Sequence, residues 1–140
     1  MVLNQEIFSR GKKTRWRVIG KDTMDQIWNE LSATTQPIQD YVTEIAWGEI
    51  FSRPGLDEKT RILLNLAMLA VQGENRVLAL HIRAAVNLGC SREEIREALV
   101  QTVIFAGFVK ATQACRTAQD VFDALDECDG DGPGSGGRQS

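Results

Sequence analysis

The stretch DEKTRILLNLAMLAVQG, residues 57–73, decides the fold class of this chain. Asp57 is a natural N-cap for a helix, and the centre of the stretch is apolar except for Asn65. It shows no period-two alternation of the kind that favours a strand, and Gly73 breaks it. The pattern predicts a helix over residues 58–72 that is buried nearly all round.

Helical signals recur on both sides of this stretch. Pro37 suits the first turn of a helix, because it lacks only a donor that would be unpaired there. Ser91 to Glu94 reads as a capping box, and the chain is expected to kink or break near Gly107. Further helices are predicted over residues 23–31, 37–51, 74–88, 91–106 and 107–125. Together these helices form an all-α bundle of about six helices.

The two ends of the chain differ in composition from the helical part, residues 23–128. Residues 1–22 form a basic N-terminal arm, which is either solvated and partly flexible or folded over a site for an anionic small molecule. Residues 129–140 are rich in glycine and are expected to form a disordered tail. The predicted organisation is one helical domain between two appendages.

The composition is that of an ordinary globular protein, with 140 residues, 43% hydrophobic, 25% charged and a formal net charge of -3. No stretch reaches the roughly 18 apolar residues of a membrane span, and the N-terminus lacks the apolar core of a secretory signal. A cytoplasmic protein without a membrane partner is therefore expected. No second basic patch supports nucleic-acid binding. The apolar helices leave few polar faces, which indicates a homo-oligomer.

Cysteine and histidine usage argues against a metal site. Cys90, Cys115 and Cys128 are far apart and form no CxxC pair, so neither a zinc site nor a dithiol redox site is indicated. His81 is the only histidine of the chain. We expect reduced thiols and no metal.

His81 and Glu49 are the two ionisable groups that helical periodicity places on apolar faces. An imidazole there needs a partner or costs about 1–3 kcal/mol, so His81 is either a satisfied core histidine or a catalytic one. Glu49 ends an apolar stripe with Val42 and Ile45. It either pairs with an arginine such as Arg53, or fixes the tautomer and orientation of His81.

Arginines and tryptophans supply the remaining candidates. Arg53, Arg61 and Arg83 are either clamps for a carboxylate or solvated surface residues. Trp28 and Trp47 are expected to be anchors in the core or at an interface.

Several separated motifs agree in order and spacing with one known family. They are AWGEIFSRPGLD at residues 46–57, Thr60–Arg61, LALHIRAA at residues 78–85, Ser91–Ala98, Gln101–Thr102, Ala106–Gly107 and, in the arm, Gly11, Arg15, Val18, Ile19 and Gly20. On these motifs the chain resembles the gamma-carboxymuconolactone decarboxylases over residues 10–122.

The resemblance implies an all-helical fold assembled as trimers or hexamers, with sites near subunit boundaries. It also implies removal of CO2 from a small carboxylated lactone without a cofactor, because the conjugated lactone is itself the electron sink. On this resemblance Glu49 and His81 are the catalytic, proton-handling pair. The residues that would contact the anionic substrate are Arg53, Arg83, Arg15 and Trp47.

The chain departs from the wider family at two places. The alkylhydroperoxidase D-like peroxidases depend on a CxxC pair ahead of the histidine, and no cysteine lies just before His81, which excludes that branch. The decarboxylases usually carry a tyrosine, a proline and an asparagine in the segment where this chain has Phe105 and then Phe108 to Thr112.

These replacements predict a pocket lined by Phe105 and Phe108 for a larger or less polar molecule. One alternative is a family member that catalyses isomerisation, cyclisation or ring opening in a specialised biosynthetic pathway. The other is a non-catalytic oligomeric binding protein.

Overall fold

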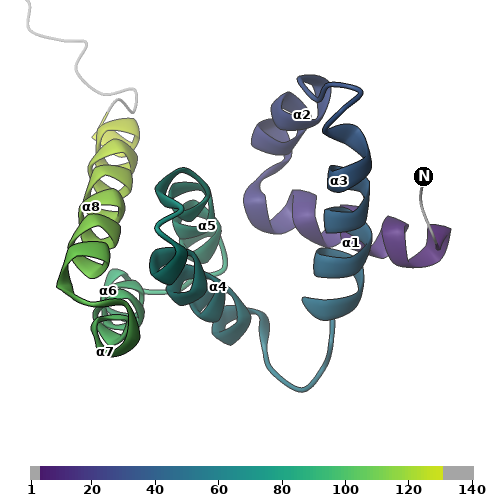
Figure 1. Ribbon diagram of the computed structural model, residues 1–140. Helices are drawn as coiled ribbons and strands as arrows, with labels where there is room; N and C mark the ends of the chain where they lie inside the picture. The colour runs from purple at the N-terminus through teal and green to yellow at the C-terminus, as the bar shows by residue number, and fades with distance from the viewer. Residues whose placement is uncertain (1–3, 131–140) are drawn as a thin grey trace, which may run out of the picture.

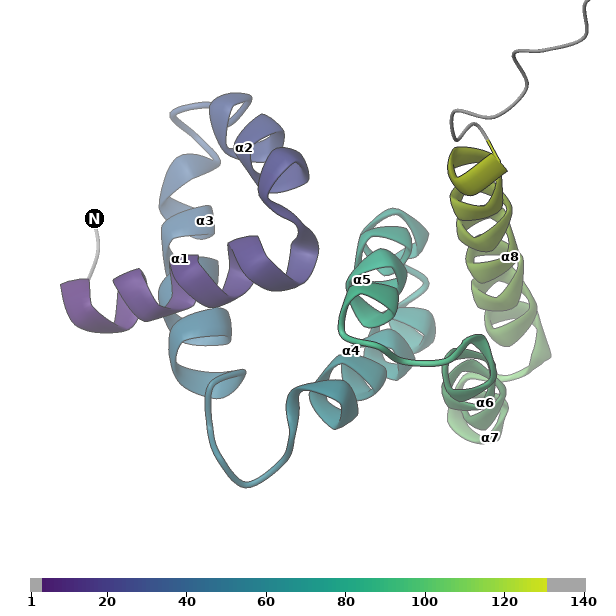
Figure 2. The same cartoon turned by 180° about the vertical axis from the view of Figure 1, so that it is seen from behind.

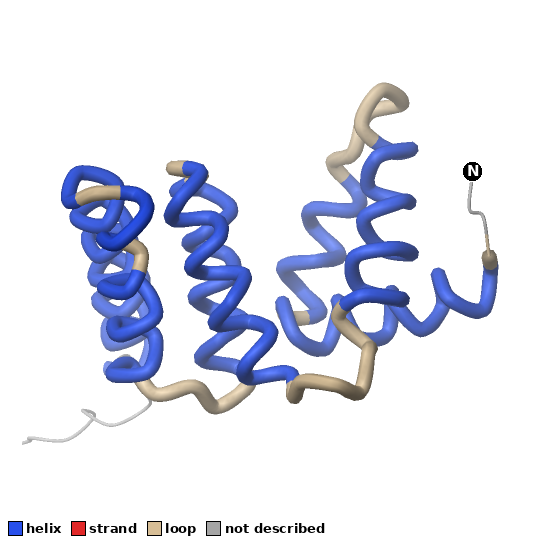
Figure 3. The backbone as a smooth tube through the Cα atoms, turned by 60° about the horizontal axis from the view of Figure 1, so that its bottom comes forward, coloured by secondary structure: helices blue, strands red, loops and turns tan. Residues whose placement is uncertain are grey.

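The computed structural model describes residues 4–130, and this part of the chain contains helices and no strands (Figure 1, Figure 3). The elements are α1 (Gln5–Ile19), α2 (Lys21–Asn29), α3 (Gln36–Tyr41), the π-helical segment η1 (Val42–Ile50), α4 (Glu58–Gln72), α5 (Asn75–Asn87), α6 (Arg92–Gln101), α7 (Val103–Ala106) and α8 (Phe108–Gly130). The predicted all-α class is confirmed. Most of the expected tail, residues 131–140, lies outside the described residues.

Helix α4 has the predicted bounds, and its caps explain them. The Asp57 carboxylate accepts a hydrogen bond from the Thr60 amide at 2.7 Å, and Gly73 ends the helix at a φ of 76°, a left-handed conformation that favours glycine. The helix is not buried all round, however. Leu64 and Met68 are 47% and 56% exposed, because only the other side of α4 packs against α5, α6 and α8.

The second half of the chain also follows its local signals. Ser91 and Glu94 form the predicted capping box at the start of α6. Gly107, with a φ of 82°, separates the short α7 from α8, which is the predicted break. The helix after this break runs to Gly130, further than predicted.

The N-terminal segment is a packed helix rather than a flexible arm. The Asn4 side chain caps α1 by accepting from the Ile7 amide at 3.1 Å. Gly11 is buried where α1 crosses η1, and a Cβ placed there would lie 2.7 Å from the Gly48 amide nitrogen. The crossing therefore depends on a residue without a side chain.

The helix predicted over residues 37–51 is present but changes character halfway. Its first part is α3, with Pro37 in the first turn as predicted. Its second part, η1, forms backbone hydrogen bonds five residues apart, such as the Phe51 amide to the Ala46 carbonyl at 2.8 Å. The wider turn rotates side chains away from the faces that a 3.6-residue period assigns.

The α4–α5 pair lies in the middle of the molecule (Figure 1, Figure 2). Helices α6, α7 and α8 lie on one side of it, and α1, α2, α3 and η1 lie on the other. Helix α1 contacts α5, where the Asn87 side chain donates to the Val18 carbonyl at 3.1 Å. Among residues 4–130, no helix is both long and apolar enough to span a bilayer.

Candidate active site

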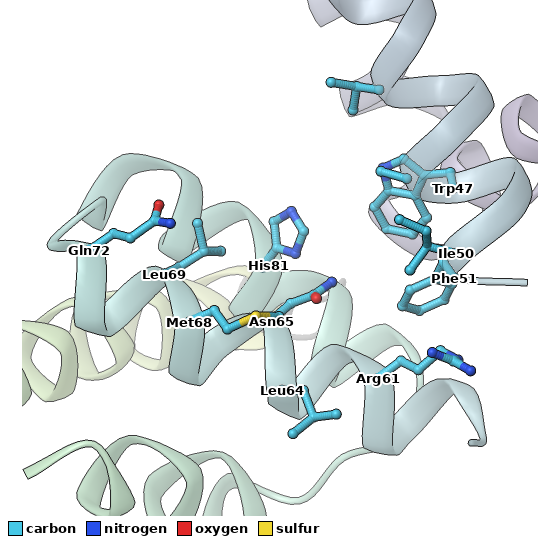
Figure 4. A pocket seen from close by; sticks show the side chains of 12 residues that line it. Trp47, Ile50, Phe51, Arg61, Leu64, Asn65, Met68, Leu69, Gln72 and His81 are labelled. Carbon is cyan, nitrogen blue, oxygen red and sulfur yellow. The ribbon is translucent and has the colours of Figure 1, made fainter. Parts of the chain in front are cut away.

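A cleft of about 460 Å³ separates η1 from the α4–α5 pair (Figure 4), a size that suits a small organic ligand. Its two walls differ in chemistry. The η1 wall is apolar and consists of Val42, Ala46, Trp47, Ile50 and Phe51. The opposite wall carries the polar groups and consists of Arg61, Leu64, Asn65, Met68, Leu69, Gln72 and His81.

His81 projects from α5 into this cleft and faces Trp47, with the two ring centroids 6.0 Å apart (Figure 4). Its Nδ1 atom is buried and has no hydrogen-bond partner. Burial, together with the smaller effect of the nearby positive charge of Arg15, lowers the pKa of His81 to about 4. The imidazole is therefore neutral near pH 7 and has an unused hydrogen-bonding atom.

Arg61 is the second group in the cleft with an unsatisfied polar atom. One terminal nitrogen of its guanidinium donates to the Arg53 carbonyl at 2.9 Å, which fixes the direction of the side chain. Its Nε atom is buried and has no partner. Leaving such a donor unpaired costs about 1–3 kcal/mol, which an incoming acceptor would recover.

Arg15 lies behind the η1 wall and does not line the cleft. Its guanidinium is buried and donates to the Thr43 hydroxyl at 2.9 Å and to the Gln39 side-chain oxygen at 2.7 Å. Burial lowers the pKa of Arg15 to about 10, so it stays charged at neutral pH. It was expected to contact the substrate, but its N–H groups hold the α3–η1 helix and its charge acts on His81.

The structure does not bring Glu49 to His81. Glu49 is exposed on the outer side of η1, where its carboxylate lies 3.6 Å from the guanidinium of Arg10. The prediction assumed α-helical spacing. The wider turn of η1 instead rotates Glu49 away from the apolar face that carries Val42. The buried carboxylate of this segment is Glu44, which is only 4% exposed.

The other predicted contacts divide between the cleft and the outer surface. Trp47 lines the cleft and packs on Phe51, with ring centroids 4.7 Å apart. The side chains of Arg53 and Arg83 do not line it. Arg53 contributes only its backbone carbonyl, which accepts a hydrogen bond from Arg61.

Phe105 and Phe108 do not line this cleft within one chain. They are 95% and 77% exposed, and Phe108 borders a separate groove formed by α6, α7 and α8. The Gly107 break turns this corner of the chain away from the α4–α5 surface that faces η1 (Figure 1).

Sequence reasoning gave too little weight to the polar row on α4. Arg61, Asn65 and Gln72 are spaced four and seven residues apart, so they share one helical face, and all three line the cleft. The signal was available, because Asn65 is the one polar interruption in the apolar centre of that helix.

The low pKa of His81 predicts an acid-sensitive fold. The folded protein resists protonation down to about pH 4, whereas in the unfolded chain His81 titrates near 6.5. As pH falls from 6.5 to 4, the unfolded state binds more protons and stability is lost, by up to about 3 kcal/mol from this group. Urea unfolding at pH 7 and pH 4 should show a larger loss in the wild type than in His81→Gln, which keeps only the loss from carboxyls with lowered pKa values such as Asp57. Equal losses in both proteins would contradict it.

No group of three or more histidine, cysteine or acidic side chains in residues 4–130 is arranged to hold a metal ion. Residues 36–120 match the model of the carboxymuconolactone decarboxylase family.

Two curated proteins with named activities are similar to the chain over most of its length. A 4-carboxymuconolactone decarboxylase of Acinetobacter baylyi is 30% identical, covering 87% of this chain and 91% of that protein. A nitrosuccinic acid decarboxylase of Metarhizium robertsii is 34% identical, covering 88% of this chain and 86% of that protein.

Proposed function

The chain belongs to the carboxymuconolactone decarboxylase family, and from that premise we propose that it is a cofactor-independent carboxy-lyase. Its substrate is a small carboxylated lactone or ring that binds in the cleft between η1 and the α4–α5 pair. One observation carries the proposal: Arg61 Nε and His81 Nδ1, both buried and without partners, belong to residues that line the same cleft. Buried polar atoms normally have hydrogen-bond partners, so a bound ligand is expected to supply partners for these two atoms.

The charge of the cleft selects an anion. Arg61 is the one charged residue among those that line it, and no acidic residue lines it within the described part of the chain. Arg15 adds positive charge from behind the wall. A carboxylate would therefore meet a favourable field, while a cationic ligand would not.

The reaction that fits breaks the bond between the carboxyl carbon and its neighbour. CO2 leaves, and the electron pair moves into an electron-accepting group of the substrate, whose oxygen gains charge that Arg61 stabilises. A proton from His81 then forms the new C–H bond. The two named relatives act on a lactone and on a nitro acid, and both groups can accept such an electron pair.

His81 must take up a proton before it can deliver one. The imidazole is neutral at rest, because burial and the charge of Arg15 lower its pKa to about 4. An anion bound beside it favours the imidazolium form and raises that pKa. Substrate binding thus causes His81 to take up a proton from solvent. This is the proton that later replaces CO2 on the substrate carbon.

The apolar η1 wall assists the same step. A carboxylate against Trp47 and Ile50 loses its hydration, whereas the departing CO2 is neutral and needs none. The wall therefore favours the uncharged product over the charged reactant.

Other readings of the scaffold are weaker. A binding protein without catalysis would have His81 bonded to core groups and Glu49 in solvent. Glu49 is in solvent, but His81 faces the cleft with a free Nδ1 atom. Isomerisation, cyclisation or ring opening could use the same proton-handling residue, and the product mass distinguishes them from decarboxylation.

The proposal includes a homo-oligomer, trimer or hexamer, as the working form. Its support is a set of exposed apolar side chains larger than a monomer usually leaves in water. Those on α7 and α8 are Ile104, Phe105, Phe108 and Val109.

The test is CO2 release from 4-carboxymuconolactone and from nitrosuccinic acid, with the assembly state checked by analytical ultracentrifugation. Turnover of either acid is expected. Arg61→Gln should lower kcat/KM about 10- to 100-fold, the worth of one charge-assisted hydrogen bond. Arg53→Gln is the matched control and should stay near wild type, because it keeps the backbone carbonyl that positions Arg61.

Two results would contradict the proposal. One is a folded, assembled protein that releases CO2 from neither acid. The other is a product of unchanged mass, which would instead indicate an isomerase or cyclase on the same scaffold.

A further inference from the structure

The indole ring of Trp47 lies next to His81 in the cleft (Figure 4). The centroids of the two rings are 6.0 Å apart, and their planes are inclined by 37°, which is closer to parallel than to perpendicular. Trp47 is 5% exposed and packs on Phe51, so its ring has little freedom to turn away. The imidazole of His81 therefore keeps an aromatic neighbour at a fixed distance.

This neighbour favours the protonated form of the imidazole. The face of an indole ring is electron-rich, and it attracts a cation that lies within about 6 Å of the ring centroid. The attraction grows when the cation is removed from water, and the Nδ1 atom of His81 is buried.

From this geometry we propose that Trp47 is a positioning residue that acts through His81, because its ring stabilises the imidazolium form that delivers the proton. The inference rests on the proposed function, since it assumes that His81 carries the proton of the reaction. It deepens that function by giving Trp47 a role beyond that of an apolar wall.

No charged group that lines the cleft favours the imidazolium in the free protein. Arg15, which reaches His81 from α1, opposes its protonation. Arg61 of α4 is also a cation, and it is the one charged residue of the cleft lining. Within the described part of the chain, η1, α6 and α8 bring no charged side chain to that lining, since the buried Glu44 of η1 does not belong to it.

The substrate alone cannot stabilise the imidazolium throughout the reaction. A bound carboxylate favours this form, but its charge disappears from that place when it leaves as neutral CO2. The electron pair of the broken C–C bond moves to the oxygen that Arg61 stabilises. The ring of Trp47 is present before and after this step. It keeps the imidazolium populated until its N–H bond breaks, the new C–H bond forms and His81 becomes neutral again.

A more stable imidazolium should raise the rate, although it is a weaker acid. The pKa of His81 is about 4 in the free protein, well below neutral pH. In this range a tenfold weaker acid is protonated about tenfold more often, whereas its proton transfer slows by less than tenfold. Loss of the attraction should therefore lower both the pKa of His81 and kcat near pH 7.

The test replaces the three tryptophans of the chain, Trp16, Trp28 and Trp47, by tryptophan that carries one, two or three ring fluorines. Fluorine withdraws electron density from the ring face and changes the size of the ring little, so burial and water exclusion are kept. His81 is the only histidine, so one carbon-13 NMR signal of the untagged, ligand-free protein reports its pKa. Circular dichroism checks the fold at each pH.

We expect the pKa of His81 to fall with each added fluorine, by about 0.4 to 1.5 in all, which corresponds to the loss of a cation–π interaction. The kcat for CO2 release at pH 7 should fall in the same order. An unchanged or rising pKa would overturn the proposal, because a wall that only excludes water does not respond to the electron density of its ring.

Two variants assign the effect to one ring. In Trp47→Phe the fluorines remain only on Trp16 and Trp28, which pack on each other and do not line the cleft. The pKa of His81 should then be independent of fluorination, and a dependence that survives in this variant would contradict the assignment. In the double variant Trp16→Phe/Trp28→Phe the full dependence should persist, a result that does not require Trp47→Phe to fold.

The NMR measurement needs no turnover, so this inference and the proposed function can fail separately. A pKa that falls with fluorination, in a protein that releases CO2 from neither acid, would leave the attraction between Trp47 and His81 standing and reject the carboxy-lyase. CO2 release with a pKa that does not respond to fluorine would reject the role of Trp47 alone.

Discussion

His81→Gln should lower kcat for CO2 release at least a hundredfold while the protein keeps its fold. Glutamine retains a polar side chain in the cleft, but it cannot carry a proton at neutral pH. Proton delivery by a positioned side chain contributes typically 10²- to 10⁴-fold to rate, which sets the expected loss. The fold should survive, because Nδ1 of His81 has no hydrogen bond within the protein to lose.

Glu49→Gln tests whether Glu49 takes part in catalysis, as helical periodicity predicted, or lies outside the site, as the structure places it. A catalytic partner of His81 would lose activity as severely as His81 itself. The exposed position of Glu49 beside Arg10 predicts a change in kcat of less than about threefold, because surface pairs contribute little. Equal losses of kcat in Glu49→Gln and His81→Gln would show that Glu49 does take part in the reaction.

The measurement should follow the proton as well as the rate. In D2O the wild type should place one deuterium on the carbon that loses CO2, and the protonation of that carbon should slow. His81→Gln, with unchanged circular dichroism and assembly state, should have a lowered kcat. That kcat should no longer fall in D2O as it does in the wild type. Wild-type kcat in the variant would assign proton delivery to another group.

Local signals predicted the second half of the chain well because its ends are defined by short-range interactions. The Asp57 cap and the Ser91–Glu94 capping box act within one turn, so they can be recognised without knowing the neighbours. The position of His81 on an apolar face also followed from periodicity. Its unpaired Nδ1 and lowered pKa did not, since they depend on Arg15 and on the opposite wall.

The first half of the chain was predicted less well because its structure depends on a tertiary contact. Residues 5–19 are polar on average and read as an arm, yet they form a helix against η1. The π turn in η1 then shifted the assignment of Glu49 from a buried face to the surface. A pattern that assumes one helical period cannot detect either event.

Gly11→Ala should destabilise the protein by about 3 kcal/mol or more, although alanine is the better helix former by about 1 kcal/mol. The added methyl would overlap the Thr43 carbonyl oxygen and lie 2.7 Å from the Gly48 amide nitrogen. Both are backbone atoms of η1, so no side chain can rotate out of the way. Helix α1 would have to move off η1.

Gly55→Ala is the matched control, since it adds the same methyl where no atom lies within 4 Å. Its free energy of unfolding in urea should stay within about 0.5 kcal/mol of wild type. If Gly11→Ala were equally harmless, α1 would not depend on the close crossing.

The consequence for the cleft tests the same contact from the other side. The η1 wall carries Trp47 and Phe51 and is held by α1 through Arg10 and Arg15, so Gly11→Ala should also lower kcat/KM for CO2 release under conditions where the variant remains helical.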